Sequence, residues 1–146
     1  MWRIWIRVKQ IVNYINKRIT TFSFTLGSIG YGFYHFFNPG ILTYSNTYAA
    51  VNQIFGLIGG RYFGLIFIVV GCLKLYGLIV DNIYLKLPLY FVLLFLWILL
   101  GCCFFIAFLF TNVNPSFIYC FIIAAMSTNI IKMHQQEIVI KGDVDG

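Results

Sequence analysis

Four long apolar runs alternate with short polar stretches along the chain. They cover residues 20–37, 62–80, 88–110 and 115–133. Each run is close to the ~20 residues that an α-helix needs to cross ~30 Å of hydrocarbon, and the first only just meets that length. The pattern predicts an all-α integral membrane protein, whose four-transmembrane-helix bundle extends over residues 20–133.

Residues 1–19 have a different, helical periodicity. At ~100° per residue, one face collects Ile4, Val8, Ile11, Val12, Ile15 and Ile19, opposite Lys9, Asn13, Asn16 and Lys17. We expect an N-terminal amphipathic basic helix that lies on the membrane surface before the chain turns into the bilayer. The alternative is a frayed basic terminus that only sets topology.

The polar stretches indicate where the spans end. Asn38, Pro39 and Gly40 end the first run, and 41–61 is a longer connection. Asn114 is expected to be an N-cap residue, with Pro115 in the first turn of the last span. Residues 111–113 are expected in the short turn before it, and 134–146 form a polar cytoplasmic tail.

A signal peptide is an alternative interpretation of the N-terminal part. Thr47, Tyr48 and Ala49 have the small-x-small form of a cleavage site. The segment before them is longer and more polar than an ordinary signal, so we expect a retained helix.

Composition supports the membrane interpretation. The chain is 61% apolar and 10% charged, with sixteen phenylalanines and ten tyrosines in 146 residues, whereas charged residues make up about 25% of soluble domains. A soluble domain of this length could not bury so much apolar surface. The chain has room for one bundle and no second domain.

Charge gives the expected topology. Half of the ten basic residues lie within the first 18 positions: Arg3, Arg7, Lys9, Lys17 and Arg18. This cluster suits a cytoplasmic membrane surface, and no basic, aromatic surface is long enough for nucleic acid. With both termini cytoplasmic, Lys86, Lys132 and Lys141 also fall inside, and Arg61 falls outside. The lipid bilayer is therefore the expected partner.

Catalytic and metal-binding patterns are missing from the sequence. The four cysteines lie in apolar runs without C-x-x-C spacing, and no acidic residue occurs in a span. We expect no enzyme, cofactor or metal. His35 is a lone histidine, interpreted as an interface residue rather than a ligand.

Lys74 is the one charged residue deep inside an expected span, since Lys132 lies one residue from the end of the last span. It lies ~9 Å from the inner end of that span, near the expected depth of Ser127, Thr128 and Asn129. We interpret these as membrane-buried polar residues. Two hypotheses remain open for Lys74: an anchor that snorkels or bonds to a hydroxyl of Ser23, Thr25, Ser127 or Thr128, or part of a polar path.

Small residues mark the expected helix-packing faces. Gly56, Gly60 and Gly64 repeat every four residues, and Gly71 continues this face toward Lys74. Ala124 belongs to a similar row in the last span. Small residues allow close backbone contact in lipid, either within the chain or in a homo-oligomer.

The order of features resembles small multi-span membrane proteins of bacteriophages of Gram-positive bacteria, some of which are labelled holin-like. The resemblance covers about 27–132. Three segments carry it: GSIGYG (27–32) with the following Asn-Pro-Gly, GCLKLYGLIVDN (71–82) and LFLWILLGCC (94–103).

The resemblance and the small-residue faces lead to one main functional hypothesis. It is a non-enzymatic phage-type membrane protein that oligomerises and permeabilises or perturbs the bacterial cytoplasmic membrane. The alternative is a membrane-resident interaction protein, for superinfection exclusion or envelope docking, that works through the connection at 41–60. A weaker alternative is a small-solute or ion conduit. No particular protein partner is indicated.

Overall fold

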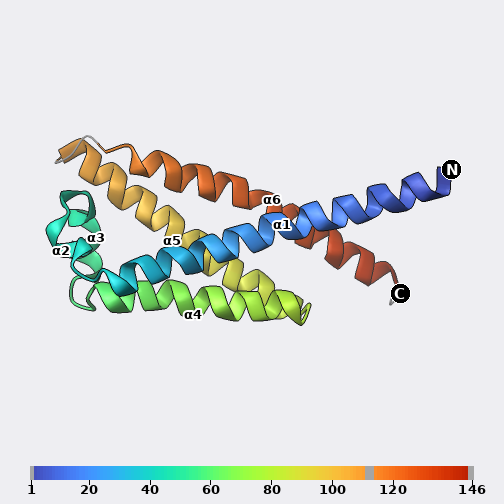
Figure 1. Ribbon diagram of the computed structural model, residues 1–146, viewed down its shortest axis with the longest axis horizontal. Helices are drawn as coiled ribbons and strands as arrows, with labels where there is room; N and C mark the ends of the chain where they lie inside the picture. Colours follow the sequence, from blue (N-terminus) through green and yellow to red (C-terminus); the bar gives the residue numbers. More distant parts are fainter. Residues whose placement is uncertain (1, 111–113, 145–146) are drawn as a thin grey trace.

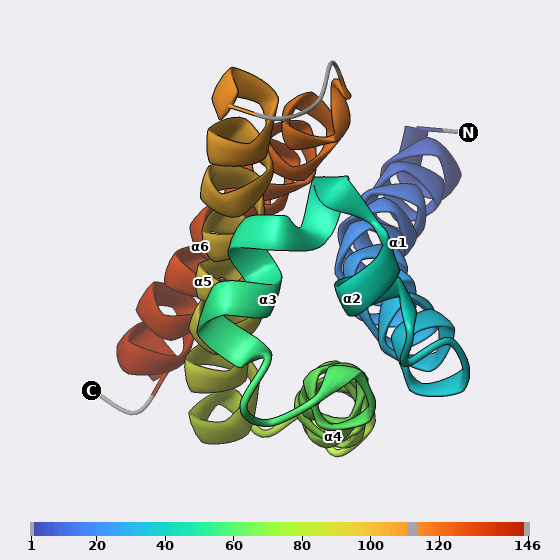
Figure 2. The ribbon, with the colours of Figure 1, turned by 90° about the vertical axis from the view of Figure 1, so that its left-hand side faces the viewer.

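The computed structural model describes residues 2–110 and 114–144. Within these residues the chain is all helical and contains no strand. The long helices are α1, α4, α5 and α6. Both termini lie at the same end of the bundle (Figure 1). The short helices α2 and α3 lie at the opposite end, which faces the viewer in Figure 2.

Helix α1 is continuous from Trp2 to Phe37 over 36 residues. The turn expected near residue 20, between a surface helix and a separate first span, is therefore wrong. No proline or glycine interrupts the chain between Trp2 and Leu26, so nothing local breaks the helix. The predicted end is correct, because Pro39 disfavours helical backbone at Asn38. The backbone N–H and the side-chain Nδ2 of Asn38 both donate to the Tyr34 carbonyl.

The connection after α1 is itself folded. It contains α2 (Ile41–Tyr44), a 3-10 turn (Asn46–Tyr48) and α3 (Ala49–Phe55). Leu42 and Val51 are buried where these pieces contact the bundle. Gly59 then starts the next helix at φ +86°, a left-handed conformation that glycine adopts without strain.

Helices α4 and α5 form an antiparallel pair. α4 extends over Gly60–Ile79, close to the expected 62–80. α5 extends over Ile83–Phe110 and starts earlier than the expected 88–110. The early start has a local cause, because the Asn82 side chain accepts from the Tyr84 amide at 3.0 Å and caps the helix. Pro88 consequently lies inside α5 rather than at its beginning.

Helix α6 covers Ser116–Val144. The predicted N-cap at Asn114 is confirmed, since its side-chain oxygen accepts from the Ser116 amide at 3.1 Å. The expected turn at 111–113 lies outside the described residues. Residues 134–144, expected in a polar tail after the last span, continue the helix, and no proline interrupts it there.

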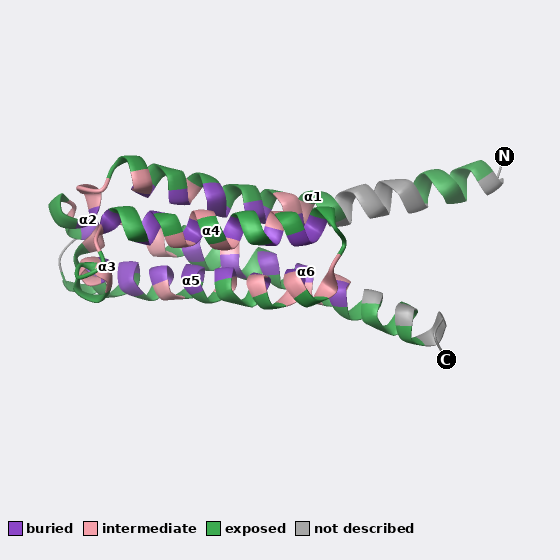
Figure 3. Ribbon diagram, turned by 90° about the horizontal axis from the view of Figure 1, so that it is seen from below, coloured by how far each residue is buried: buried purple, intermediate pink, exposed green. Residues whose placement is uncertain are grey.

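The long helices pack in pairs around an aromatic core. α1 packs along α4, α5 packs along α6, and α4 contacts α5. Phe63, Phe67, Tyr90, Leu93 and Leu100 are buried at the centre. Figure 3 shows buried residues alternating with exposed ones along these helices.

Within the described residues, three helices are long and apolar enough to cross a membrane: Gly60–Ile79, Ile83–Phe110 and Ser116–Ile140. The expected first span, 20–37, is not among them. It is the second half of α1, and the reason for its lower hydropathy lies on its buried face.

Candidate functional site

The buried face of α1 is unusually polar for a helix in an apolar protein. Its fully buried polar positions are Thr21, Thr25, Ser28 and His35. The opposite face exposes Ile19, Leu26, Phe33 and Phe37. The second half of α1 therefore turns polar groups toward the other helices and apolar groups outward.

Hydrogen bonds satisfy most of this polar face. The hydroxyls of Thr25 and Ser28 donate to the carbonyls of Thr21 and Phe24, each at 2.8 Å. Ser28 also accepts from the indole Nε1 of Trp97 at 3.0 Å. This last bond joins α1 to α5 through two buried side chains.

Lys74, on α4, is completely buried at 0% exposure. Its Nζ lies 4.7 Å from the centre of the Phe24 ring and 5.1 Å from that of Tyr90. Two aromatic faces thus stabilise the ammonium, at up to about 2 kcal/mol for a desolvated cation–π contact. Among the described residues, Nζ has no hydrogen-bond partner.

The Tyr90 ring is held in place by α6. Its hydroxyl donates to the Ser127 carbonyl at 2.8 Å, and the Ser127 hydroxyl donates to the Ala124 carbonyl at 2.8 Å. The Phe24 and Tyr90 rings lie 5.8 Å apart. We call Lys74, Phe24 and Tyr90 the Lys74 site, and it joins three helices.

The Lys74 site differs from the sequence-based interpretation. Lys74 does not reach the surface, and its Nζ makes no hydrogen bond to the hydroxyls of Ser23, Thr25, Ser127 or Thr128. Phe24 and Tyr90 were not singled out in the sequence. Both are among many aromatic residues, and only the tertiary contact distinguishes them.

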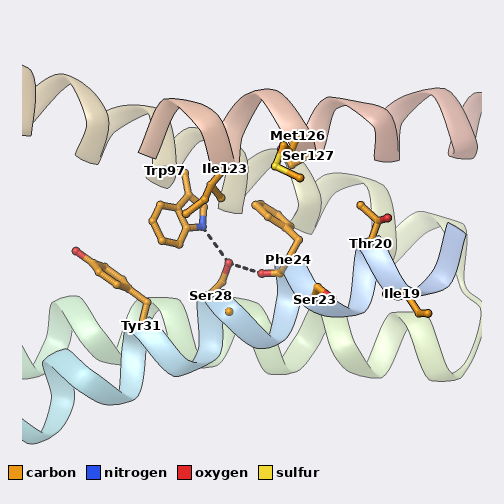
Figure 4. A pocket seen from close by; sticks show the side chains of 11 residues that line it. Ile19, Thr20, Ser23, Phe24, Ser28, Tyr31, Trp97, Ile123, Met126 and Ser127 are labelled. Carbon is orange, nitrogen blue, oxygen red and sulfur yellow. Dashed lines mark hydrogen bonds between the residues drawn. The ribbon is translucent and has the colours of Figure 1, made fainter. Parts of the chain in front are cut away.

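An apolar groove with a volume of about 560 Å³ lies beside this site, between α1 and α6. We call it the α1/α6 groove. Figure 4 shows its lining: Ile19, Thr20, Ser23, Phe24, Gly27, Ser28, Tyr31, Trp97, Ile123, Met126 and Ser127. Phe24 belongs both to this lining and to the Lys74 site, so the groove and the site adjoin at this side chain.

A second polar cluster surrounds His35 near the other end of α1. Its ring lies 4.6 Å from that of Tyr31, 5.1 Å from Tyr48 and 5.2 Å from Phe63. The Tyr31 and Tyr48 hydroxyls share a hydrogen bond of 3.2 Å. Burial raises the pKa of Tyr48, so this hydroxyl stays protonated. His35 is a core residue here, not the interface residue expected from the sequence.

The glycine face of α4 lies against α1. A Cβ at Gly64 would lie 2.5 Å from the Gly32 carbonyl oxygen, and Gly71 lies against the Ile29 side chain. Gly60 likewise contacts the backbone of Pro39. Gly56 differs, because it is exposed at the end of α3 and its nearest neighbour is Asn52 of the same helix.

The polar residues expected at the depth of Lys74 do not gather at one place. Ser127 is buried next to Tyr90, and Ala124 is buried one turn earlier on α6. Thr128 and Asn129 are exposed on the outer face of the bundle. Thr128 donates to the Ala125 carbonyl at 2.6 Å, and no hydrogen bond joins the Asn129 side chain to the described residues.

The basic residues are placed at the end of the bundle that holds the termini. Arg7, Lys9 and Arg18 are exposed along α1, while the side chains of Arg3 and Lys17 lie outside the described part. At the α4–α5 turn, a salt bridge that the sequence did not suggest joins Lys86 to Asp81. Asp81 itself takes a left-handed backbone conformation at φ +57°.

No group of three or more potential metal ligands occurs among the described residues. Comparisons of the chain with protein-family models, with curated proteins and with solved structures found no match.

Proposed function

We propose that this protein crosses the bacterial cytoplasmic membrane four times, self-associates there and permeabilises it, as a holin-like phage protein does. The outward position of Asn129 carries the proposal. Three features support it in turn: the polarity of α1, the distribution of charge, and the polar residues on the outer face of α6.

The polarity of α1 supports a fourth span. A helix that hides threonine, serine and histidine and exposes isoleucine, leucine and phenylalanine is suited to lipid on the outside and protein on the inside. Hydropathy averaged along the sequence misses this, because it counts the buried hydroxyls as if they faced lipid. The second half of α1 packs along α4, which is apolar and long enough to span.

The charge distribution supports cytoplasmic termini. Both termini and the α4–α5 turn lie at one end of the bundle, together with Arg7, Arg18 and Lys86. Arg61 lies at the other end, at the start of α4. Basic residues concentrate on the cytoplasmic side of membrane proteins.

The outer face of α6 supports self-association. Asn129 lies ~20 Å from the start of α6, well within a ~30 Å hydrocarbon layer. Its neighbours on the exposed surface include Ile122 and Met126. An amide facing lipid gains about 0.6–2 kcal/mol by bonding to another helix, and a second copy of the chain offers the same amide in return.

Permeabilisation follows if several copies meet through this face. The association would place Thr128 and Asn129 of each copy around a shared polar surface at one depth, which water and ions could occupy. This function needs no enzyme, cofactor or metal.

Induced expression in bacteria with a potential-sensitive dye tests the proposal. We expect the wild type to depolarise the cells, Asn129→Leu to lose or delay this effect, and Val69→Leu to match the wild type. Val69 is the control because it is exposed on α4, outside the outer face of α6. The proposal fails if the wild type leaves the potential intact, or if Asn129→Leu depolarises as fast as the wild type.

A second measurement tests the association directly. A cysteine at position 129, in a chain whose four natural cysteines are replaced by alanine, should form disulfide-linked dimers in membranes. A cysteine at Val69, which is exposed on α4, should not. Equal crosslinking at both positions would indicate random collision.

The alternative function, an interaction protein, has one observation in its favour. Tyr44 is 91% exposed and Leu57 100% exposed at the end of the bundle formed by α2 and α3. Exposed apolar side chains outside the membrane suit a partner on the host envelope. If Tyr44→Ser with Leu57→Ser abolishes superinfection exclusion without changing depolarisation, this alternative is favoured.

A further inference from the structure

The α1/α6 groove is a site for an apolar chain. It extends from Ile19 to Tyr31 along α1, ~18 Å at 1.5 Å per residue, and its volume of about 560 Å³ is typical of ligand pockets. The hydrogen-bonding groups of its floor are already occupied, because Trp97 and Ser28 bond to each other and Ser127 bonds to Ala124. What remains available to a ligand is mainly hydrocarbon surface.

The Lys74 ammonium, immediately behind the groove, lacks an anion. A buried charge is stable only when it is paired or hydrogen-bonded, and two aromatic rings meet this need in part. Among the described side chains, Asp81 is the only carboxylate, and it is bonded to Lys86 at the α4–α5 turn. An anion that pairs with this ammonium would therefore come from outside the described side chains.

Phe24 connects the two features. Its ring forms part of the groove wall and lies 4.7 Å from Lys74 Nζ. One turn further along α1, a Cβ at Gly27 would meet no atom within 4 Å, so the groove has free space beside this ring. Rotation of the Phe24 side chain toward the open space at Gly27 would create a path from the groove to the ammonium and leave the rest of the groove to a ligand.

We propose that the α1/α6 groove and Lys74 together bind a long-chain carboxylate, a free fatty acid of the membrane. The acyl chain lies in the groove against Trp97 and Ile123, and the carboxylate pairs with Lys74 Nζ after the Phe24 ring moves aside. The ligand enters sideways between α1 and α6. The groove adjoins the proposed association face at Met126, which lines the groove and is exposed beside Asn129. Asn129 itself does not line the groove.

Trp97 provides the assay, because it lines the groove. In detergent-purified protein with Trp2→Phe and Trp5→Phe, a stearate brominated in mid-chain should quench Trp97 with a saturable curve. Lys74→Met should weaken the apparent affinity by at least about tenfold, and the brominated methyl ester should bind the wild type as weakly. Lys132→Met, which removes an exposed lysine from α6, should leave the affinity unchanged.

Two further variants separate binding from simple partition and from misfolding. Trp97→Phe with Phe95→Trp moves the indole to an exposed position two residues away. There, quenching should rise linearly with the concentration of brominated stearate. Ile123→Trp should fill the groove and block binding with Lys74 intact.

Equal quenching by the acid and the methyl ester would overturn the proposal, as would unchanged affinity in Lys74→Met or in Ile123→Trp. A lysophosphatidate of equal chain length should compete less well than stearate. Competition at about tenfold lower concentration would instead assign the site to a phosphate headgroup.

Discussion

The contact between α1 and α4 at Gly32 and Gly64 provides a sharp quantitative prediction. A Cβ at Gly64 would lie 2.5 Å from the Gly32 oxygen, 2.6 Å from the Phe36 nitrogen and 3.1 Å from the His35 carbonyl carbon. All three are backbone atoms of α1, so no side chain can rotate away. Gly64→Ala therefore forces the two helices apart.

Two opposing terms set the size of this effect. Overpacking a close contact costs about 1–3 kcal/mol, whereas alanine is favoured over glycine within a helix by about 1 kcal/mol. The control is Gly30→Ala, also in a helix, where a Cβ would meet nothing within 4 Å. Gly30→Ala gains only the preference of a helix for alanine over glycine. The difference in unfolding free energy between the two variants therefore isolates the steric cost.

The assay is unfolding in mixed micelles with increasing sodium dodecyl sulfate, followed by circular dichroism. We expect Gly64→Ala to be about 1–3 kcal/mol less stable than Gly30→Ala, a difference of roughly five- to 150-fold in the unfolding equilibrium. If the two variants unfold together, the backbones do not touch at Gly32 and Gly64 and the assigned pairing of α1 with α4 is incorrect.

Three more predictions use the same unfolding assay. Ser28→Ala should cost about 1–3 kcal/mol because it leaves the buried Trp97 N–H without an acceptor, and a loss below the assay error would contradict this bond. Asn114→Ala should cost about 1 kcal/mol by removing the cap of α6 and its 3.2 Å bond to Thr47, whereas Asn114→Ser should retain most of the cap. In ligand-free protein, Lys74→Met should be neutral or stabilising, since it removes an unpaired buried charge; a large loss would mean that the ammonium has an anionic partner within the chain.

Local signals in the sequence were sufficient for the ends of several helices. Pro39 and Asn114 act through their own backbone and their nearest neighbours, so the end of α1 and the cap of α6 could be predicted without knowledge of the fold. The glycine face of α4 could be recognised for the same reason, because its spacing lies within one helix. Gly32, its partner on α1, could not be assigned, since the pairing of helices depends on tertiary structure.

The Lys74 site could not be predicted, because its parts come from three helices. Phe24 and Tyr90 are far from Lys74 in sequence, and aromatic residues are so frequent here that none stands out. The continuity of α1 could not be predicted, because its residues change from basic and amphipathic to mostly apolar near residue 20 while the helix itself continues. A change in the environment of a helix was thus interpreted as a break in the chain.

The uninterrupted length of α1 has a mechanical consequence. At 36 residues the helix measures ~54 Å, far more than the thickness of the hydrocarbon layer. Its basic half therefore cannot lie at a right angle to the half that packs along α4, and it extends beyond the end of α4 as a straight arm (Figure 1). A force applied to this arm would act as a lever on the α1–α4 contact, with Gly32 and Gly64 as the pivot.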